Sequence, residues 1–342
     1  MAVVQISRIQ VRRGQKNAGS GLPQLASGEL GWAVDTRELY IGNGAVSEGA
    51  PAVGNTKVLT EFDNIFSLTE AYTYRTDDAY IVTGGDVSTP IVRSLQARLD
   101  DTVSGRSFGL TGQTSQIATA KLQTAIDQLY LNSATKGSAQ SKIVLHLEAG
   151  EYIVDDTIYI PPYATIVGAG SGKTIIRTST ASTTIFKTVN SNSTPGAPAT
   201  DASTTSVNQA TDIRLEGVTL ETTVPNKGLI LENCKDSVFR DVEVTGPWVS
   251  GNAVALTDVG IEMNSLSGTV ETKNNIFENC KVNGYSYGIS SDWDIHNNMW
   301  DNCSFASCSY GFAFATNLNT LNSLAGSGQE KGPYNNTITN SR

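Results

Sequence analysis

The strongest evidence in the sequence about the fold of this chain is an internal repeat that runs from residue 213 onward. A short unit of alternating apolar and polar residues occurs five times, and successive copies start 24, 38, 23 and 38 residues apart. A second element, a glycine between apolar residues, lies between the copies. Two strand-like motifs that recur together at a period near 23 residues indicate a solenoid. The units are 215–220, 239–244, 277–282, 300–305 and 338–342, and the glycines are Gly228, Gly260, Gly288 and Gly311.

Each repeat is too short for a propeller blade and carries no helical pattern, so a parallel β-helix is the interpretation that is left. Equivalent residues of successive coils would then stack about 4.8 Å apart. We expect the first residue of each unit to form one buried ladder and the fourth residue another. Cys280 and Cys303 fall in the second ladder and are expected to be small core residues.

The third position of each unit is expected to be a corner of the coil, because glycine and asparagine tolerate left-handed backbone. Asparagines stacked at such a corner can also hydrogen-bond along the axis. The residues at this position are Gly217, Asp241, Asn279, Asn302 and Asn340.

Upstream of the repeat, one helical pattern precedes a run of short strands. Five apolar residues fall on one helical face after Thr114 and Ser115, which we expect to act as the N-cap. The strand-like stretches that follow are separated by glycine and proline. The helical residues are Ile117, Leu122, Ala125, Ile126 and Leu129, and the strand-like stretches are 144–147, 152–154, 157–160, 165–167 and 174–176.

This order, a helix followed by LEAGEY at 147–152, IYIP at 158–161 and TIVGAG at 165–170, resembles the pectate-lyase-like right-handed β-helix of phage tailspikes. The resemblance covers about residues 100–342 and implies that the helix covers the open edge of the first coil. The predicted fold class is all-β: a small N-terminal β-hairpin module followed by a right-handed parallel β-helix with one short capping helix. This fold carries lyases, hydrolases and inert shafts, so it does not fix an activity.

The first 63 residues show a different pattern. Leu30, Trp32 and Val34 alternate with other residues, a polar turn follows, and Leu39 and Ile41 alternate again, which predicts a β-hairpin. Such a segment buries little core by itself. We therefore expect its apolar face to need a partner, either another domain or further copies of itself.

The strings RRG at 12–14, GELGW at 28–32 and DTRELYIGNG at 35–44 resemble a module at the N-terminus of many bacteriophage tail-fibre and other virion proteins. The resemblance implies a small, usually trimeric β element that faces the rest of the particle. On this basis we expect virion attachment to involve Arg12, Arg13, Trp32 and Tyr40. The alternative is an ordinary hairpin with protected edges.

We expect three segments: an attachment module at 1–63, a connector at 64–112 and the β-helix at 113–342. The connector string RSLQARLDDTVS at 93–104 resembles the lead-in to a tailspike β-helix but lacks the acidic stretch that often follows. The sequence ends inside a repeat unit, so we expect the β-helix to continue beyond residue 342.

Composition and charge argue against some classes of binding partner. The net charge is −9, which argues against a nucleic-acid partner. No stretch approaches 18 apolar residues, so we expect no membrane insertion, and the N-terminus is not typical of a secretory signal. The four cysteines form no CxxC pair and His146 and His296 lie far apart in sequence, so we expect neither a metal nor another cofactor.

The best candidate for chemistry is a pair of carboxylates, because glycoside hydrolysis uses one as an acid and the other as a base or nucleophile. Asp292 and Asp294, with Asp301 nearby, are the candidate catalytic residues, and Trp293 between them is the candidate carbohydrate-binding residue. The alternative is a solvated turn between coils.

The resemblances together suggest the proximal part of a trimeric phage tail fibre or tailspike. Its expected partners are copies of itself, tail or baseplate proteins through residues 1–63, and a host surface polysaccharide. Its expected location is the virion tail region, after assembly in the host cytoplasm. The alternatives are a polysaccharide-degrading β-helix enzyme and a virion whisker or decoration protein without a receptor role.

Overall fold

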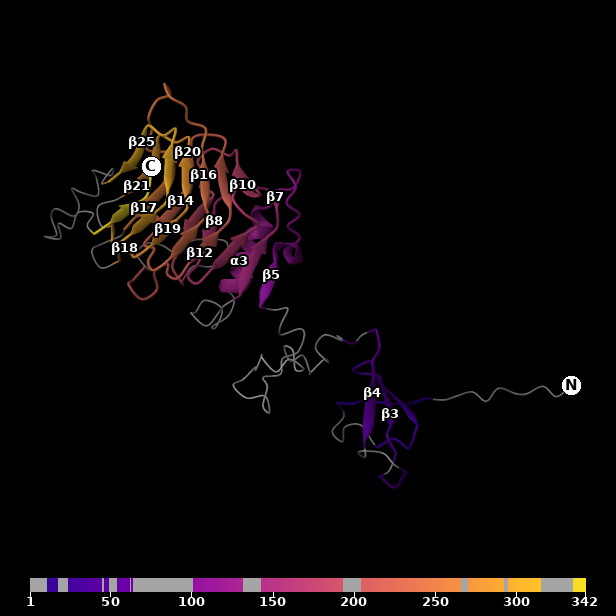
Figure 1. Cartoon of the computed structure of the whole chain (residues 1–342). Helices are drawn as coiled ribbons and strands as arrows, with labels where there is room; N and C mark the ends of the chain where they lie inside the picture. The colour runs from indigo at the N-terminus through magenta and orange to yellow at the C-terminus, as the bar shows by residue number, and fades with distance from the viewer. Residues whose placement is uncertain are drawn as a thin grey trace. The chain divides into compact units, whose positions relative to one another are not determined.

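The computed structural model describes residues 11–17, 24–44, 46–48, 54–61, 63, 101–131, 143–192, 204–265, 270–291, 295–314 and 335–342 (Figure 1). The chain divides into two compact units, residues 1–99 and 100–342. The second unit begins at Asp100 and therefore includes β5 (Thr102–Ser104), which lies in the connector predicted from the sequence. β5 pairs with β6 (Val144–Leu147) of the β-helix.

The N-terminal unit contains a four-stranded sheet. The predicted hairpin is present: β2 (Leu30–Ala33) and β3 (Glu38–Gly42) pair antiparallel. β1 (Arg12–Gly14) joins β2 in parallel, and β4 (Asn55–Val58) joins β3 antiparallel. A short 3-10 helix, η1 (Val46–Glu48), lies between β3 and β4.

Side-chain direction alternates along each strand, so this sheet has two different faces. One face carries the larger apolar residues, including Trp32, Leu39 and Val58, which stand opposite one another in the sheet and are only half-buried. The other face carries Tyr40 and Ala33, which are buried together with Leu25. The core of this unit therefore contains Tyr40, Ala33 and Leu25, and Trp32 and Leu39 are left partly accessible.

The second unit is a parallel β-helix of three sheets (Figure 1). All its strand pairs are parallel, and successive coils contribute one strand to each sheet, which confirms the predicted fold class. Sheet one contains β5 (Thr102–Ser104), β6 (Val144–Leu147), β9 (Thr165–Gly168), β12 (Arg214–Glu216), β15 (Val238–Arg240), β19 (Ile276–Glu278), β23 (Met299–Asp301) and β26 (Thr337–Thr339).

Sheet two contains β7 (Gly150–Ile153), β10 (Thr174–Thr178), β13 (Thr219–Thr222), β16 (Glu243–Thr245), β20 (Lys281–Asn283) and β24 (Ser304–Ala306). Sheet three contains β8 (Ile158–Ile160), β11 (Phe186–Thr188), β14 (Lys227–Glu232), β17 (Val259–Asn264), β21 (Tyr287–Ser291) and β25 (Tyr310–Ala313). A short ladder of β18 (Thr272–Lys273) and β22 (Ile295–His296) lies at the corner between sheets three and one.

The predicted buried ladder lies in sheet one. Leu215, Phe239, Phe277 and Trp300 are in register and at most 1% exposed. The rings of Phe239, Phe277 and Trp300 stack at centroid distances of 4.9 and 5.3 Å. Ile338 keeps this register but is exposed, because β26 is the edge strand of the sheet. Cys280 and Cys303 are buried in the neighbouring ladder, as expected.

The predicted corner is also present. Gly217, Asp241, Asn279, Asn302 and Asn340 all have φ between 50° and 64°. Asn302 Nδ2 donates a hydrogen bond of 2.7 Å to Asn279 Oδ1, so the stacked amides bond along the axis.

One helix, α3 (Thr119–Tyr130), covers the first coil (Figure 1). It follows η2 (Gly105–Phe108), and its buried face contains Leu122, Ala125, Ile126 and Leu129, as predicted. The predicted N-cap at Thr114–Ser115 is wrong, because the helix starts at Thr119 and Ala118 caps it without a side-chain hydrogen bond. The N–H of Ala118 instead donates to Ile153 O at 2.7 Å, which ties this segment to β7 and leaves Ile117 exposed.

No helix within the described residues is long and apolar enough to cross a membrane.

Candidate functional site

The candidate catalytic cluster falls mostly outside the described residues, because Asp292, Trp293 and Asp294 are not among them. Asp301 lies on β23, where its Oδ1 accepts hydrogen bonds of 2.9 Å from Asn340 Nδ2 and from Thr339 Oγ1. These bonds lower the pKa of Asp301. The carboxylate therefore holds the next coil in place, and its role in chemistry stays a prediction.

The four candidate attachment residues divide between the two faces of the N-terminal sheet. Arg13 stands opposite Trp32 on the half-buried apolar face. Arg12 lies 3.6 Å from Glu29 and is in register with Gly31, on the same face as Tyr40. Because β-sheet residues in register point the same way, Arg13 with Trp32 can form one contact surface that does not include the other two.

A compact charged network supports the face that carries Tyr40. The Tyr40 hydroxyl donates to Glu38 Oε2 at 2.8 Å, and Lys16 Nζ lies 2.7 Å from the same oxygen. Lys57 bridges Glu38 and Asp63. Hydrogen bonds from Lys16 and then Lys57 hold the pKa of Glu38 far below its usual range. This face is therefore fixed by its own ion pairs, whereas the Trp32 face has unused apolar surface.

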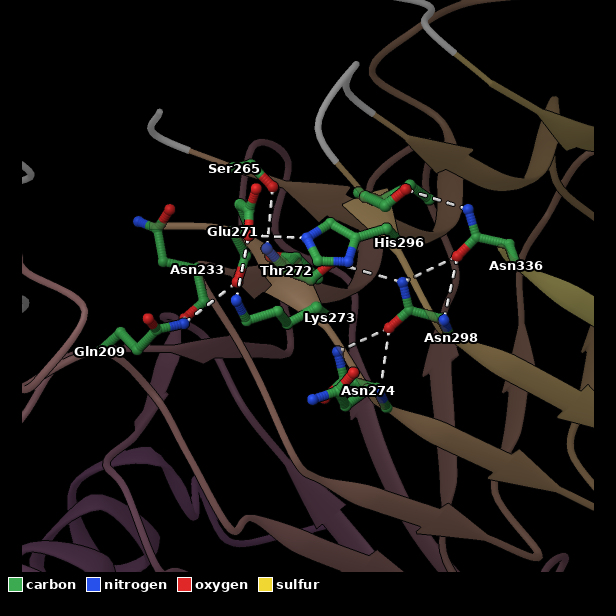
Figure 2. A network of polar contacts seen from close by, with 12 residues as sticks. Gln209, Asn233, Ser265, Glu271, Thr272, Lys273, Asn274, His296, Asn298 and Asn336 are labelled. Atoms are coloured by element: carbon green, nitrogen blue, oxygen red, sulfur yellow. Dashed lines mark hydrogen bonds and ion pairs between the residues drawn. The ribbon is translucent and has the colours of Figure 1, made fainter. Parts of the chain in front are cut away.

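The β-helix contains a second polar cluster that the sequence analysis missed, at the corner of β18 and β22 (Figure 2). Glu271 Oε2 lies 2.6 Å from His296 Nε2 and 3.0 Å from Lys273 Nζ. The side chains of Glu271 and His296 are each only 6% exposed. Gln209 Nε2 donates to the backbone oxygens of Asn233 and Glu271, which ties this corner to earlier coils.

A buried asparagine ladder continues the cluster along the axis. Asn275 Nδ2 donates to Asn298 Oδ1 at 3.0 Å. Asn298 Nδ2 in turn donates to Asn336 Oδ1 at 3.1 Å (Figure 2). A sequence signal for it exists in the doublets at 274–275, 297–298 and 335–336, each two residues before a repeat unit. The first asparagine of each doublet is left-handed, with φ of 53° to 56°. This is a second corner of the coil.

Glu271 gives a testable pH dependence. Burial alone would raise the pKa of Glu271, but hydrogen bonds from His296 and Lys273 outweigh it and hold this pKa below the ordinary 4.5. A carboxyl with a lowered folded-state pKa stabilises the fold fully above its unfolded pKa and loses that contribution as pH falls through the folded value. We expect the free energy of unfolding to fall more steeply with pH below 4.5 in the wild type than in Glu271→Gln.

Denaturant titrations at a series of pH values measure this difference. Glu216→Gln is the matched control, because it removes a carboxylate that pairs with Arg214 on the outer surface. An acid dependence in Glu271→Gln as steep as in the wild type would contradict the assignment.

Within the described ranges, no group of three histidine, cysteine, aspartate or glutamate side chains could hold a metal ion.

Comparison with solved structures shows similarity to several proteins. The N-terminal fragment of bacteriophage phi29 gene product 12 matches at 17% identity and a TM-score of 0.43, over 60% of this chain and 33% of that one. ORF18 of Geobacillus virus E2 matches at 15% identity and a TM-score of 0.47, over 97% and 60%. The Dettilon tailspike protein matches at 13% identity and a TM-score of 0.45, over 76% and 41%.

The chain thus spans between a third and three fifths of the length of the first two of these proteins. No curated protein sequence matches it significantly. A family model does match: residues 102–323 fit "Rhamnogalacturonase A/epimerase, pectate lyase-like". That match covers well over half of the chain and includes nearly all of the β-helix. The chain therefore belongs to this pectate-lyase-like family.

Proposed function

We propose that the protein is a bacteriophage virion protein, the proximal part of a trimeric tail fibre or tailspike. In this proposal, residues 1–63 attach it to the tail or baseplate, and the β-helix is a rigid body that carries recognition of a host surface polysaccharide. The resemblance of the strings at 12–14, 28–32 and 35–44 to virion attachment modules is the sequence basis of the proposal.

The observation that carries it is the half-buried apolar face of the N-terminal sheet. Trp32 and Leu39 form a cross-strand pair there, with Leu30 opposite Ile41 beside them and Val58 opposite Leu39 on the next strand. A face with an aromatic centre and aliphatic neighbours is typical of a protein interface. Copies of the same module, packed on this face, would bury it.

The native mass of the chain tests this proposal. We expect the full chain to be a trimer by light scattering, and both the deletion of residues 1–63 and Trp32→Glu to have the native mass of a single chain. The expected cause is the loss of apolar contact and the burial of an unpaired charge in the substituted face.

Val46→Glu is the matched control, since it places the same charge on η1, where Val46 is already 64% exposed. Its mass should equal that of the wild type. A folded monomer for both the full chain and the deletion variant would overturn the trimeric fibre.

A second candidate function is cleavage of the polysaccharide, which is favoured by membership of a family described as pectate lyase-like. Asp292, Asp294 and Asp301 would supply the acid and the base, and Trp293 would contact the sugar. Release of new reducing ends from a host polysaccharide, compared between the wild type and the double variant Asp292→Asn, Asp294→Asn, tests this function.

A further inference from the structure

Two cysteines are stacked in the core of the β-helix, beside the corner between sheets one and two. Both are buried, since Cys280 is 3% exposed and Cys303 is 2% exposed. The residues that follow them, Lys281 of β20 and Ser304 of β24, are in register, and Ser304 N donates to Cys280 O at 2.9 Å. Cys280 and Cys303 are therefore equivalent residues of adjacent coils, whose backbones are about 4.8 Å apart.

The two thiols also share one orientation. Cys280 Sγ lies 3.3 Å from Phe239 O, and Cys303 Sγ lies 3.6 Å from Phe277 O. Phe239 and Phe277 are themselves equivalent residues of adjacent coils, so each sulfur atom contacts the same backbone oxygen of the coil before its own. Because the side chains point the same way, the separation of their sulfur atoms is close to the coil spacing of about 4.8 Å.

This separation suits a bridging cation better than a disulfide. A disulfide needs Cβ atoms about 3.8 Å apart, about 1 Å closer than stacked coils place them. The pairing of β19 with β23 and of β20 with β24 holds the coils at their spacing. A cation held in a line between two thiolates, with bonds of about 2.3 Å as in zinc–thiolate sites, needs sulfur atoms about 4.6 Å apart. Thiolates prefer soft cations.

The pair can be reached from a cleft over this corner. The cleft has a volume of about 440 Å³, and Asn302 and Cys303 are among the residues that line it. Because so little of either thiol is exposed, a single ion can reach the pair from this cleft where a bulky thiol reagent cannot.

Charge selects among the soft cations. Both thiols must lose their protons to bind a metal ion, and an uncompensated charge in the core is unfavourable. A divalent cation replaces the two protons and leaves the core neutral. Zn(II) is divalent but takes four ligands, and within the described ranges no group of three histidine, cysteine, aspartate or glutamate side chains could hold it.

From these contacts we propose that Cys280 and Cys303 form a site for a soft divalent cation such as Hg(II), bound in a line between the two sulfur atoms. Two thiol protons are released, two sulfur–metal bonds form, and nothing is oxidised or reduced. The bound ion joins adjacent coils through their side chains. The site does not depend on the proposed fibre, because it lies wholly within the β-helix.

Titration of the reduced full chain with Hg(II) tests the site, in an excess of a monothiol that removes the ion from isolated cysteines. Native mass spectrometry should find one retained Hg(II) per chain. X-ray absorption at the metal should show two sulfur ligands in a linear arrangement. Absence of a retained ion, or a coordination shell with a single sulfur atom, would overturn the proposal.

Cys280→Val and Cys303→Ser should each weaken Hg(II) binding by more than about a hundredfold, because even changes beyond the first ligand shell weaken metal sites by up to that factor. Both substitutions suit this ladder, since Val242 and Ser341 occupy the equivalent position in other coils. A variant that keeps the wild-type affinity would show that the retained ion is bound elsewhere.

Cys308→Ser is the matched control. It also removes one of the four cysteines, but Cys308 lies at another corner, with its Sγ atom 3.3 Å from Ala306 O. Its affinity for Hg(II) should equal that of the wild type, and an equal loss in this variant would contradict the assignment. Treatment of the metal-free chain with oxidised glutathione should leave Cys280 and Cys303 reduced. Formation of a disulfide between them, with release of two glutathione thiols, would refute the spacing on which the site rests.

Discussion

Replacing Trp300 with alanine is expected to lower the free energy of unfolding by about 4 kcal/mol, since truncating a buried aromatic residue removes its contacts and leaves a cavity. Trp300 is fully buried on β23, stacked on Phe277 and in edge contact with Phe312 at 4.8 Å. It therefore links Phe277 of sheet one to Phe312 of sheet three. Equilibrium unfolding in guanidinium chloride measures the loss.

The variant Trp300→Phe separates the contribution of ring packing from that of the buried indole N–H. The Nε1 atom of Trp300 is buried, and no hydrogen-bond partner for it occurs within the described residues. An unsatisfied buried donor is unfavourable by about 1–3 kcal/mol, so phenylalanine should remove that penalty while keeping the stack. We expect a net change below about 1.5 kcal/mol. A loss in Trp300→Phe as large as that in Trp300→Ala would contradict the account.

The second large effect is expected at Gly260, which belongs to the glycine element of the repeat. A Cβ atom there would overlap Val282 Cγ1 and lie 2.7 Å from the backbone oxygen of Gly288 in the next coil. Both atoms belong to the next coil, which is held against Gly260 by the pairing of β17 with β21. We expect Gly260→Ala to destabilise the protein by about 3 kcal/mol, the upper part of the usual range for overpacking.

Gly311→Ala is the matched control within the same element. A Cβ atom at Gly311 would meet only Phe305 Cβ, at 3.4 Å, which is an ordinary contact. Its unfolding midpoint should be close to that of the wild type. Equal destabilisation by both substitutions would show that backbone freedom, and not the close approach of coils, explains the glycines.

The repeat was enough to predict the fold, because a β-helix places each residue of one coil against its equivalent in the next. The aromatic ladder through Phe277 and the left-handed corner at Asn302 follow from position in the repeat alone. The role of the glycines did not follow, because it depends on the atoms that the next coil places against them, which at Gly260 include Val282, Gly288 and Tyr285. The buried Tyr285 side chain lies against Gly260, and its hydroxyl contacts Thr222 Oγ1 and Thr245 O. These two contacts join Tyr285 to residues that lie 40 and 63 positions earlier in the sequence.

The candidate sites were less predictable for a related reason. Glu271 and His296 are 25 residues apart, and neither lies in a recognisable motif. They meet because the corner ladder of β18 and β22 places Lys273 opposite His296. On the N-terminal sheet, alternation correctly paired the strands, but it could not show that the smaller residues Ala33 and Gly31 face the core and Trp32 faces away.

Stacked coils also set how this polypeptide uses its length. A coil of 23 residues advances the axis by only one strand spacing, which is about 0.2 Å per residue. An α-helical rod advances about 1.5 Å per residue. A parallel β-helix therefore gains little length per residue and gains a large cross-section instead. Most of each coil goes into a wide, stiff lateral wall, so evolution of such a chain can alter its corner loops one coil at a time while the stack beneath them keeps its shape.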